Sequence, residues 1–261
     1  MSIVRPGSAP LLLSNLDQKL ELLASTGVDA AVVVSFNEDQ SHETAVDFVR
    51  RVLVEALATK AVIVGSDFHF GHMRQGNVTL LREMGERHDF AAEPLVLVPR
   101  TDGVDEPVSS TAVRRALAGG EIDTANRMLG RPHEVRGIVV DGDKRGRTIG
   151  FPTANVAVPQ GICIPADGVY AALHVRPDGS EHPCAVNIGR RPTFYKDAPH
   201  SLIEAHLLDF AGDLYGEPAS LRFLAFLRSE KAFAGIDELK SQLKVDVEHA
   251  RSAVKARRQT P

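Results

Sequence analysis

The sequence is poor in cysteine. Of its 261 residues only Cys163 and Cys184 are cysteines, and no CxxC pair is present. Two cysteines are too few for a disulfide-stabilised scaffold, and without a CxxC pair the sequence has no zinc or redox motif of that kind. We therefore expect a cytoplasmic protein, kept in a reducing compartment.

Long apolar runs are also missing, and so is an excess of positive charge. No stretch approaches the ~18 continuous apolar residues of a membrane span, and the N-terminus lacks the long apolar core of a signal peptide. The formal net charge is −4, from 34 acidic and 30 basic residues. We therefore expect no membrane and no nucleic-acid partner, and any anion site must be local. The sequence leaves the oligomeric state open.

The composition, 43% hydrophobic and 25% charged, is that of a soluble globular protein rather than a disordered or fibrous one. Two domains are favoured over one at this length, because single hydrophobic cores stop growing near ~250 residues. The segment "LGRPH", Leu129–His133, is the expected boundary. It divides the chain into domains over residues 1–130 and 131–261.

Helical and strand-like segments alternate in the first domain. Ser14 with Asp17 resembles a capping box, which predicts a helix that ends at Gly27. The expected strands are Val28–Phe36, Ala61–Val64 and Leu95–Val98, and the further expected helices cover Val49–Leu57, Val78–Arg87, the residues after Ser109, and Glu121–Leu129. This alternation predicts an α/β layer with a mainly parallel sheet.

The pattern changes from about His133, where strand-like runs follow one another without helices between them. The expected strands are Val135–Val140, Gly168–Val175, Pro183–Gly189, Leu202–Asp209 and Leu221–Leu227. Strands at this spacing predict an antiparallel sheet or a small barrel. An apolar stripe from Ile236 to Val254 predicts a C-terminal helix that packs against it. The fold class is therefore α/β followed by all-β.

The segment "DGDKRGRTIGFPTAN" combines glycines with cations. Glycines allow several backbone N–H groups to converge, and cations add positive charge, as in polyphosphate sites, although the spacing is not that of a Walker A loop. A solvated basic hairpin turn is the alternative. The candidate phosphate-binding residues are Gly142, Lys144, Gly146, Arg147 and Gly150.

Three further polar side chains are candidates for chemistry. Thr153 and Asn155 lie two apart, so in an extended segment both point to one face, and their oxygens suit Mg²⁺. A simple turn is the alternative for them. Glu204 shares a strand face with apolar residues and is a candidate proton acceptor, the alternative being an edge-strand carboxylate in water. His206, on the same face, is expected to be structural.

These residues lie in motifs that resemble a known family. "RGRTIGFPTANV", "IPADGVYAA", "VNIGRRPTF", "IEAHLLDFAGDLYG" and "FLRSEKAF" occur in the order and approximate spacing of the riboflavin kinase domain. The first half resembles the adenylyltransferase domain of bacterial bifunctional FAD synthetases. The resemblance covers nearly the whole chain, and several separated motifs in one order are more specific than any one of them.

The resemblance implies a compact antiparallel barrel that transfers the γ-phosphate of ATP to the 5'-hydroxyl of riboflavin, giving FMN. By matching motif positions, Thr153 and Asn155 would hold Mg²⁺ and the phosphates, and Glu204 would accept the proton of the attacking hydroxyl. The glycine loop over Gly142–Gly150 would cover the nucleotide. Arg228 matches the family's mobile flavin-side loop, with a plain surface arginine as the alternative.

The first half carries later motifs of the adenylyltransferase domain, "GSDFHFGHMRQG" and "VSSTAVRRAL". A helix start in the second motif would suit anionic phosphates, although a simple N-cap is the alternative. The implied remnant residues are Asp67, Phe68, Ser109, Ser110, Thr111 and Arg114.

The family's first strand and its GxFDGxHxGH turn, which grips ATP, are absent from this sequence. His69–His72 spells HxGH, but it follows a later strand, so we interpret the spelling as a coincidence. We expect a truncated, incomplete Rossmann-like nucleotidyltransferase domain with FMN adenylyltransferase activity absent or much reduced. Two alternatives stay open: a bifunctional enzyme that also makes FAD, through His69 and His72 or through residues upstream, and a non-catalytic flavin-binding regulator.

Overall fold

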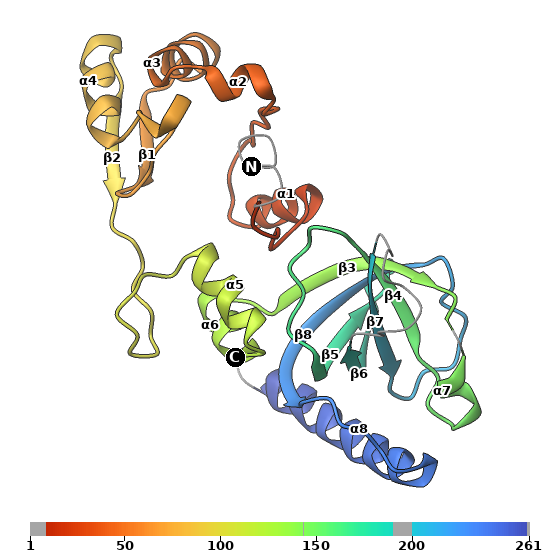
Figure 1. The fold of residues 1–261 in the computed structure, drawn as a ribbon. Helices are drawn as coiled ribbons and strands as arrows, with labels where there is room; N and C mark the ends of the chain where they lie inside the picture. The colour runs from red at the N-terminus through yellow and green to blue at the C-terminus, as the bar shows by residue number, and fades with distance from the viewer. Residues whose placement is uncertain (1–8, 143, 190–199, 260–261) are drawn as a thin grey trace. The chain divides into compact units, whose positions relative to one another are not determined.

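The computed structural model describes residues 9–142, 144–189 and 200–259 (Figure 1). The chain divides into two compact units, one formed by Gly27–Val108 with the residues before Leu11, and the other by Leu11–Thr26 with Ser109–Pro261. These contacts group helices α5 (Ser110–Ala118) and α6 (Ile122–Leu129) with the second unit. The predicted domain boundary at residue 130 stays a prediction.

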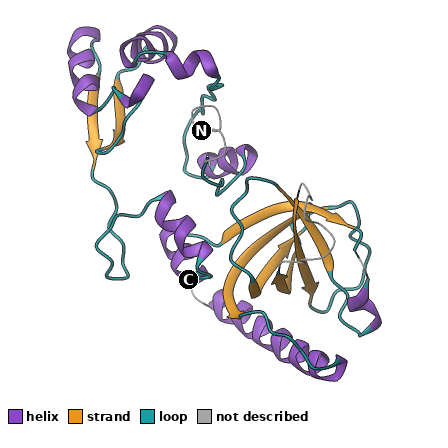
Figure 2. Cartoon of the chain, in the orientation of Figure 1, coloured by secondary structure: helices purple, strands orange, loops and turns teal. Residues whose placement is uncertain are grey.

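The first unit contains a two-stranded parallel sheet with helices (Figure 2). Strand β1 (Ala61–Gly65) pairs with β2 (Ala91–Leu95). The helical elements are α2 (Glu38–His42), α3 (Ala45–Phe48), the π-helix η1 (Val49–Ala56), the 3₁₀ helix η2 (His72–Arg74) and α4 (Val78–His88). Their core is formed by the buried side chains Val49, Leu81, Met84 and Phe90.

Two of the strands expected in this unit are corrected by the structure. Val28–Phe36 forms no strand, and Val32 and Val33 are 64% and 56% exposed. An apolar run becomes a strand only when its backbone finds a partner, and within the described residues β1 pairs with β2 alone. The last expected strand, Leu95–Val98, lies earlier, at Ala91–Leu95, because the five residues of β1 end opposite Leu95.

The first helix, α1 (Leu16–Ala24), belongs to the second unit and begins one residue later than Ser14 and Asp17 predict. The capping box is formed by Asn15 and Gln18: the backbone N–H of Gln18 donates to Oδ1 of Asn15 at 2.8 Å, and the Asn15 N–H donates to Oε1 of Gln18 at 3.0 Å. The reciprocal bonds satisfy two of the helix's unpaired N–H groups. The side chain of Gln18 can accept from the Asn15 N–H as a carboxylate would. The capping box therefore forms at Asn15 and Gln18, one position after the predicted pair.

The second unit contains a closed antiparallel barrel with the strand order β3-β4-β7-β6-β5-β8 (Figure 1). The strands are β3 (His133–Val140), β4 (Ala154–Pro159), β5 (Gly168–Val175), β6 (Glu181–Ile188), β7 (His200–Leu207) and β8 (Pro218–Arg228). The predicted barrel is confirmed. Its interior is filled by apolar side chains, among them Val135, Val156, Tyr170, Ile203 and Phe223.

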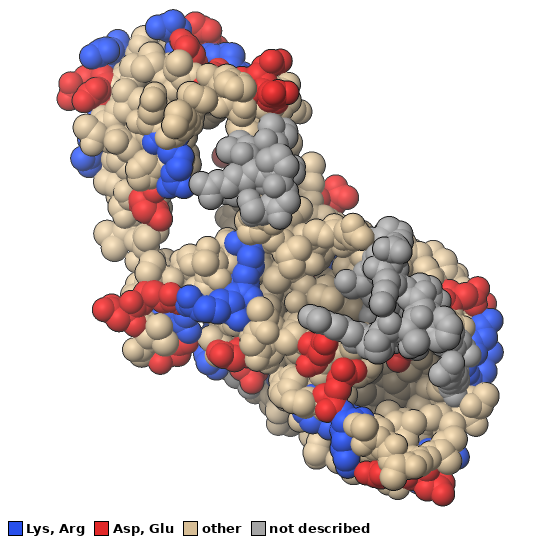
Figure 3. All heavy atoms as spheres, viewed as in Figure 1, with Lys and Arg blue, Asp and Glu red and all other residues tan. Residues whose placement is uncertain are grey.

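Helix α8 (Ile236–Gln259) lies along the outside of the barrel, as the apolar stripe predicts (Figure 1). It contacts β5, β6 and β8, and its buried Val254 packs with Leu173 and Leu224. Across the described part of the chain, none of the helices has the length and apolar character needed to cross a membrane. On the face shown in Figure 3, acidic and basic side chains are interspersed.

His133 is buried at the start of β3, with only 2% of its surface exposed. Its Nε2 lies 2.9 Å from the carbonyl oxygen of Cys163. Burial lowers the pKa of His133 to about 4, although the Cys163 carbonyl acts in the opposite direction. The folded protein therefore binds fewer protons at this site than the unfolded chain between pH 6.5 and 4.

We expect this histidine to make folding less stable in mild acid. Because the folded-state pKa lies below the unfolded value, stability falls as the pH drops below about 6.5, by about 2 kcal/mol between pH 7 and pH 5. Urea unfolding at the two pH values measures the loss. His133→Gln, which keeps a donor near the Nε2 position and does not titrate, is the control, and an equal loss in both proteins would contradict the prediction.

Candidate functional site

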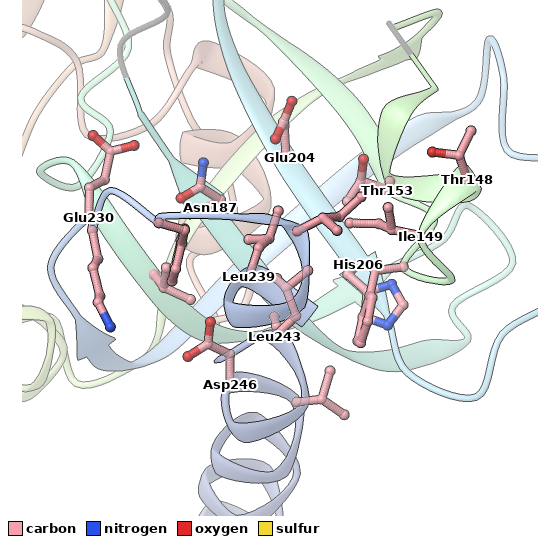
Figure 4. A pocket seen from close by; sticks show the side chains of 18 of the residues that line it. Thr148, Ile149, Thr153, Asn187, Glu204, His206, Glu230, Leu239, Leu243 and Asp246 are labelled. Carbon is pink, nitrogen blue, oxygen red and sulfur yellow. The ribbon is translucent and has the colours of Figure 1, made fainter. Parts of the chain in front are cut away.

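One row of cross-strand neighbours runs over the outer face of the barrel. Asn155 on β4 pairs with Glu204 on β7, and Glu204 pairs with Asn187 on β6. Asn187 in turn pairs with Val169 on β5, which pairs with Arg228 on β8. All five residues line one cavity of about 630 Å³ (Figure 4). The barrel register thus brings Asn155 and Glu204 together as direct neighbours on adjacent strands, although 49 positions separate them in the sequence.

The cavity has an apolar wall from helix α8 and a polar wall from the barrel. Helix α8 contributes Ile236, Leu239, Leu243 and Val247. The barrel contributes the amides and the carboxylate of the cross-strand row, and Thr153 just before β4. Such a site suits a flat, largely apolar ligand that carries a few polar groups.

Asn155 has an unsatisfied side chain. It is only 5% exposed, and within the described residues its Oδ1 is buried without a hydrogen-bond partner. A buried acceptor left unpaired costs about 1–3 kcal/mol, so such atoms are rare unless a ligand or ion completes them. An amide oxygen held bare in a residue that lines the same cavity as Thr153 fits a magnesium ligand.

Steric and backbone constraints require glycine at three positions of the loop before β4. A Cβ added at Gly142 would lie 2.6 Å from Cγ of Asn155, so a glycine is needed for the amide to take its place. A Cβ at Gly146 would collide with the carbonyl oxygen of Phe151, whose N–H donates to the Gly146 carbonyl at 2.8 Å. Gly150 has a φ of +88°, which disfavours other residues.

The same loop contains the short helix α7 (Arg145–Thr148) and the predicted cations. Lys144 lies in the left-handed region with its Nζ 3.0 Å from Asp141 and 5.3 Å from the ring centroid of Tyr215. Arg147 lines a second cavity of about 280 Å³ with Tyr215 and Phe210. Thr153 lines both cavities. Asp143 in this loop, and residues 190–199 with most of the "GRRPTF" motif, lie outside the described residues.

Asn187 and Glu230 line the larger cavity and lie in two of the quoted motifs, although neither was predicted as a site residue. Asn187 flanks Glu204 on the side opposite Asn155. Glu230, on the segment after β8, is given room by Gly189, because a Cβ there would collide with its carboxylate. Burial raises the pKa of Glu230, helped by the charge of Asp167. The strand register places Asn187 beside Glu204, and sequence spacing alone does not predict this pairing.

Arg228 is not a plain surface arginine. Its Nε lies 2.9 Å from Oδ1 of Asp246 on α8, and its Nη2 lies 2.7 Å from Oδ2. The Asp246 side chain is 2% exposed, and Gln242 also donates to it at 3.0 Å. The pair joins the end of β8 to helix α8, so Arg228 has a structural partner. A flavin contact of Arg228 stays a prediction.

Two of the predicted adenylyltransferase residues in the second unit, Ser109 and Arg114, make local hydrogen bonds. Ser109 caps α5, its Oγ accepting from the Ala112 N–H at 3.1 Å, as the N-cap alternative predicts. Ser110 and Thr111 begin the helix. The Nε of Arg114 donates to the carbonyl of Leu11 at 2.6 Å.

The HxGH spelling and its surroundings lie in the first unit. Phe68 stacks on Phe70, and Nδ1 of His69 lies 2.8 Å from the carbonyl of Asp67. Nδ1 of His72 lies 2.9 Å from the carbonyl of Ser41. In the described ranges no three His, Cys, Asp or Glu side chains group into a metal site.

The closed barrel carries a glycine loop, the Asn155 amide oxygen and the Glu204 carboxylate around one cavity, an arrangement that suits a small β-barrel phosphotransferase. Comparisons with known proteins agree. The riboflavin kinase family model matches residues 129–254, and the FAD synthetase family model matches residues 1–112. The chain belongs to the bifunctional riboflavin kinase/FMN adenylyltransferase family, as its motifs predicted.

Individual relatives are similar over nearly the whole chain. The Pseudomonas fluorescens bifunctional riboflavin kinase/FMN adenylyltransferase is 40% identical over 247 residues, which are 95% of this chain and 77% of the relative. The Escherichia coli K12 protein of that name is 39% identical over 241 residues, covering 91% and 74%. A crystal structure titled macrolide-efflux protein from Streptococcus pneumoniae matches with a TM-score of 0.80 and 28% identity, covering 92% and 76%.

Proposed function

We propose that this chain is a magnesium-dependent riboflavin kinase, which transfers the γ-phosphate of ATP to the 5'-hydroxyl of riboflavin and releases FMN and ADP. The observation that carries the proposal is the cross-strand pair of Glu204 and Asn155 beside the glycine loop, with the Asn155 amide oxygen left bare. The match of residues 129–254 to the riboflavin kinase family supports it. The free, buried cysteines fit a cytoplasmic location.

The two cavities suit the two substrates. The larger one, with its apolar wall from α8, would take the isoalloxazine ring of riboflavin. The smaller one, lined by Phe210 and Tyr215, would take the nucleoside of ATP. Thr153 lines both cavities, so the phosphates would lie at Thr153, with Lys144 from the larger cavity and Arg147 from the smaller one adding positive charge.

Glu204 would accept the proton of the riboflavin 5'-hydroxyl as its oxygen attacks the γ-phosphorus. The new O–P bond forms while the bond from the γ-phosphorus to the bridging oxygen of ADP breaks. Thr153 and Asn155 would hold Mg²⁺, which when bound neutralises charge on the phosphates. Positioning and charge neutralisation make up most of what phosphoryl transfer requires of a protein.

Gly142→Ala tests the role of the Asn155 amide. The added methyl cannot fit unless the amide moves, because its carbon would lie 2.6 Å from Cγ of Asn155. We expect KM for MgATP to rise about tenfold or more, the scale of one misplaced polar ligand. Gly119→Ala is the matched control, since its Cβ meets nothing closer than 3.5 Å. Equal kinetics in the two variants would contradict the steric argument.

We further propose that FMN adenylyltransferase activity is absent or much reduced in this chain. Over the residues given, the sequence contains no GxFDGxHxGH segment. The alternative, a bifunctional enzyme, is supported by the FAD synthetase match over residues 1–112.

One experiment separates these functions. The purified chain is incubated with riboflavin and MgATP, and the flavins are separated by chromatography. We expect FMN to accumulate with little FAD. Substantial FAD would establish the bifunctional alternative. Flavin binding without ATP consumption would instead indicate a non-catalytic regulator and overturn the kinase.

A further inference from the structure

Thr153 stands just outside the hydrogen-bonded ladder of the barrel. Among the described residues, the pairing of β4 with β7 begins at Ala154 and Ala205. Thr153 comes one position earlier and follows Pro152, which has no backbone N–H to donate. The ladder therefore does not hold the peptide that carries Thr153, and its placement needs another contact.

His206 supplies that contact. Its Nδ1 lies 2.7 Å from the carbonyl oxygen of Pro152. Because a carbonyl oxygen only accepts, Nδ1 must carry the hydrogen and donate it. The imidazole also meets the ring of Phe151 edge-on, with the centroids 5.4 Å apart and the planes at 61°. His206 thus contacts both residues that precede Thr153.

The same strand, β7, carries both His206 and Glu204. The two residues are two positions apart, so they share the outer face of the barrel, and both line the larger cavity with Thr153. Figure 4 shows His206 and Thr153 on the same side of this cavity. A strand that holds the proton acceptor would therefore also hold, through one hydrogen bond, the residue placed at the phosphates.

We propose that His206 is a positioning residue, which fixes Thr153 relative to Glu204 by donating from Nδ1 to the Pro152 carbonyl. The proposal rests on the proposed function of Thr153 at the phosphates. It assigns a role to a histidine that sequence reasoning treated as structural. It also predicts that the hydrogen-bond donor at the δ position matters more than the ring contact with Phe151.

Two substitutions separate the donor from the ring. His206→Asn keeps an N–H group at the position of Nδ1, and His206→Leu has similar bulk without a donor. We expect His206→Leu to weaken MgADP binding about tenfold, measured by calorimetry, and to raise KM for MgATP similarly, because a lost hydrogen bond has about this effect. His206→Asn should bind MgADP within about threefold of the wild type on the same scale.

A measurement on the wild type tests the hydrogen bond without any activity. Long-range ¹⁵N–¹H NMR spectra at pH 8 should show the His206 ring with its hydrogen on Nδ1. A hydrogen on Nε2 would overturn the proposal, as would unchanged MgADP affinity in His206→Leu. Weaker riboflavin binding with normal MgADP binding would also overturn it and indicate a direct flavin contact. If the wild type makes no FMN, the proposed function fails. The NMR spectra and the MgADP affinities would still test whether His206 donates to the Pro152 carbonyl and supports nucleotide binding.

Discussion

Glu204→Gln is expected to lower kcat for FMN formation by about 10² or more, the usual scale for losing a positioned general base. Glutamine has nearly the same shape, so it preserves the cross-strand row with Asn155 and Asn187, but its amide cannot accept the hydroxyl proton. Because the loss affects the transition state, riboflavin and MgADP binding should change little. Steady-state assays with calorimetry on the same preparation measure both quantities.

Glu248→Gln is the matched control for this substitution. Glu248 lies on α8 with its side chain 71% exposed, outside the residues that line the cavity. This substitution makes the same chemical change elsewhere in the molecule, so the turnover of the Glu248→Gln variant should equal that of the wild type. Near-normal turnover in Glu204→Gln would contradict a role of Glu204 as the general base. A lower melting temperature of this variant would instead attribute the loss of turnover to impaired folding.

The site shows what a sequence can predict and where prediction stops. Period-two spacing predicts that Thr153 and Asn155 point to one face, and both line the same cavity, because alternation along an extended chain is a local property. The neighbours of Glu204 depend instead on the register of three strands, which is determined only when the barrel closes. Asn187 lies in the motif "VNIGRRPTF", but its place beside Glu204 follows only from the strand register.

The wrong predictions in the first half have a similar cause. Val28–Phe36 has the composition of a buried strand, but strand formation depends on backbone partners elsewhere in the chain, and the described residues offer it none. The helix expected over Val78–Arg87 agrees closely with α4, and the structure shows local contacts at both ends: Asn77 caps its start, and Asp89 ends it in the left-handed region. For these two segments, the one with local caps was predicted well and the one that needs a distant strand partner was not.

Arg228→Ala is expected to destabilise the barrel unit by about 3–5 kcal/mol, because it leaves the Asp246 carboxylate buried without its partner. The Asp246 side chain is 2% exposed, and the arginine meets it with two hydrogen bonds. After the substitution, the amide of Gln242 would still donate to this carboxylate, but the two hydrogen bonds from the guanidinium would be lost. Urea unfolding of both proteins measures the difference in the free energy of unfolding.

Arg251→Ala gives the matched comparison, because Arg251 on α8 also meets a carboxylate, that of Asp209, with two hydrogen bonds. There the aspartate is 72% exposed, so water replaces the lost partner and little stability should be lost. Equal losses in the two variants would contradict the argument from burial. If Arg228→Ala kept full stability but lost riboflavin binding, Arg228 would belong to the flavin site, as its motif predicts, rather than to the junction of β8 with α8.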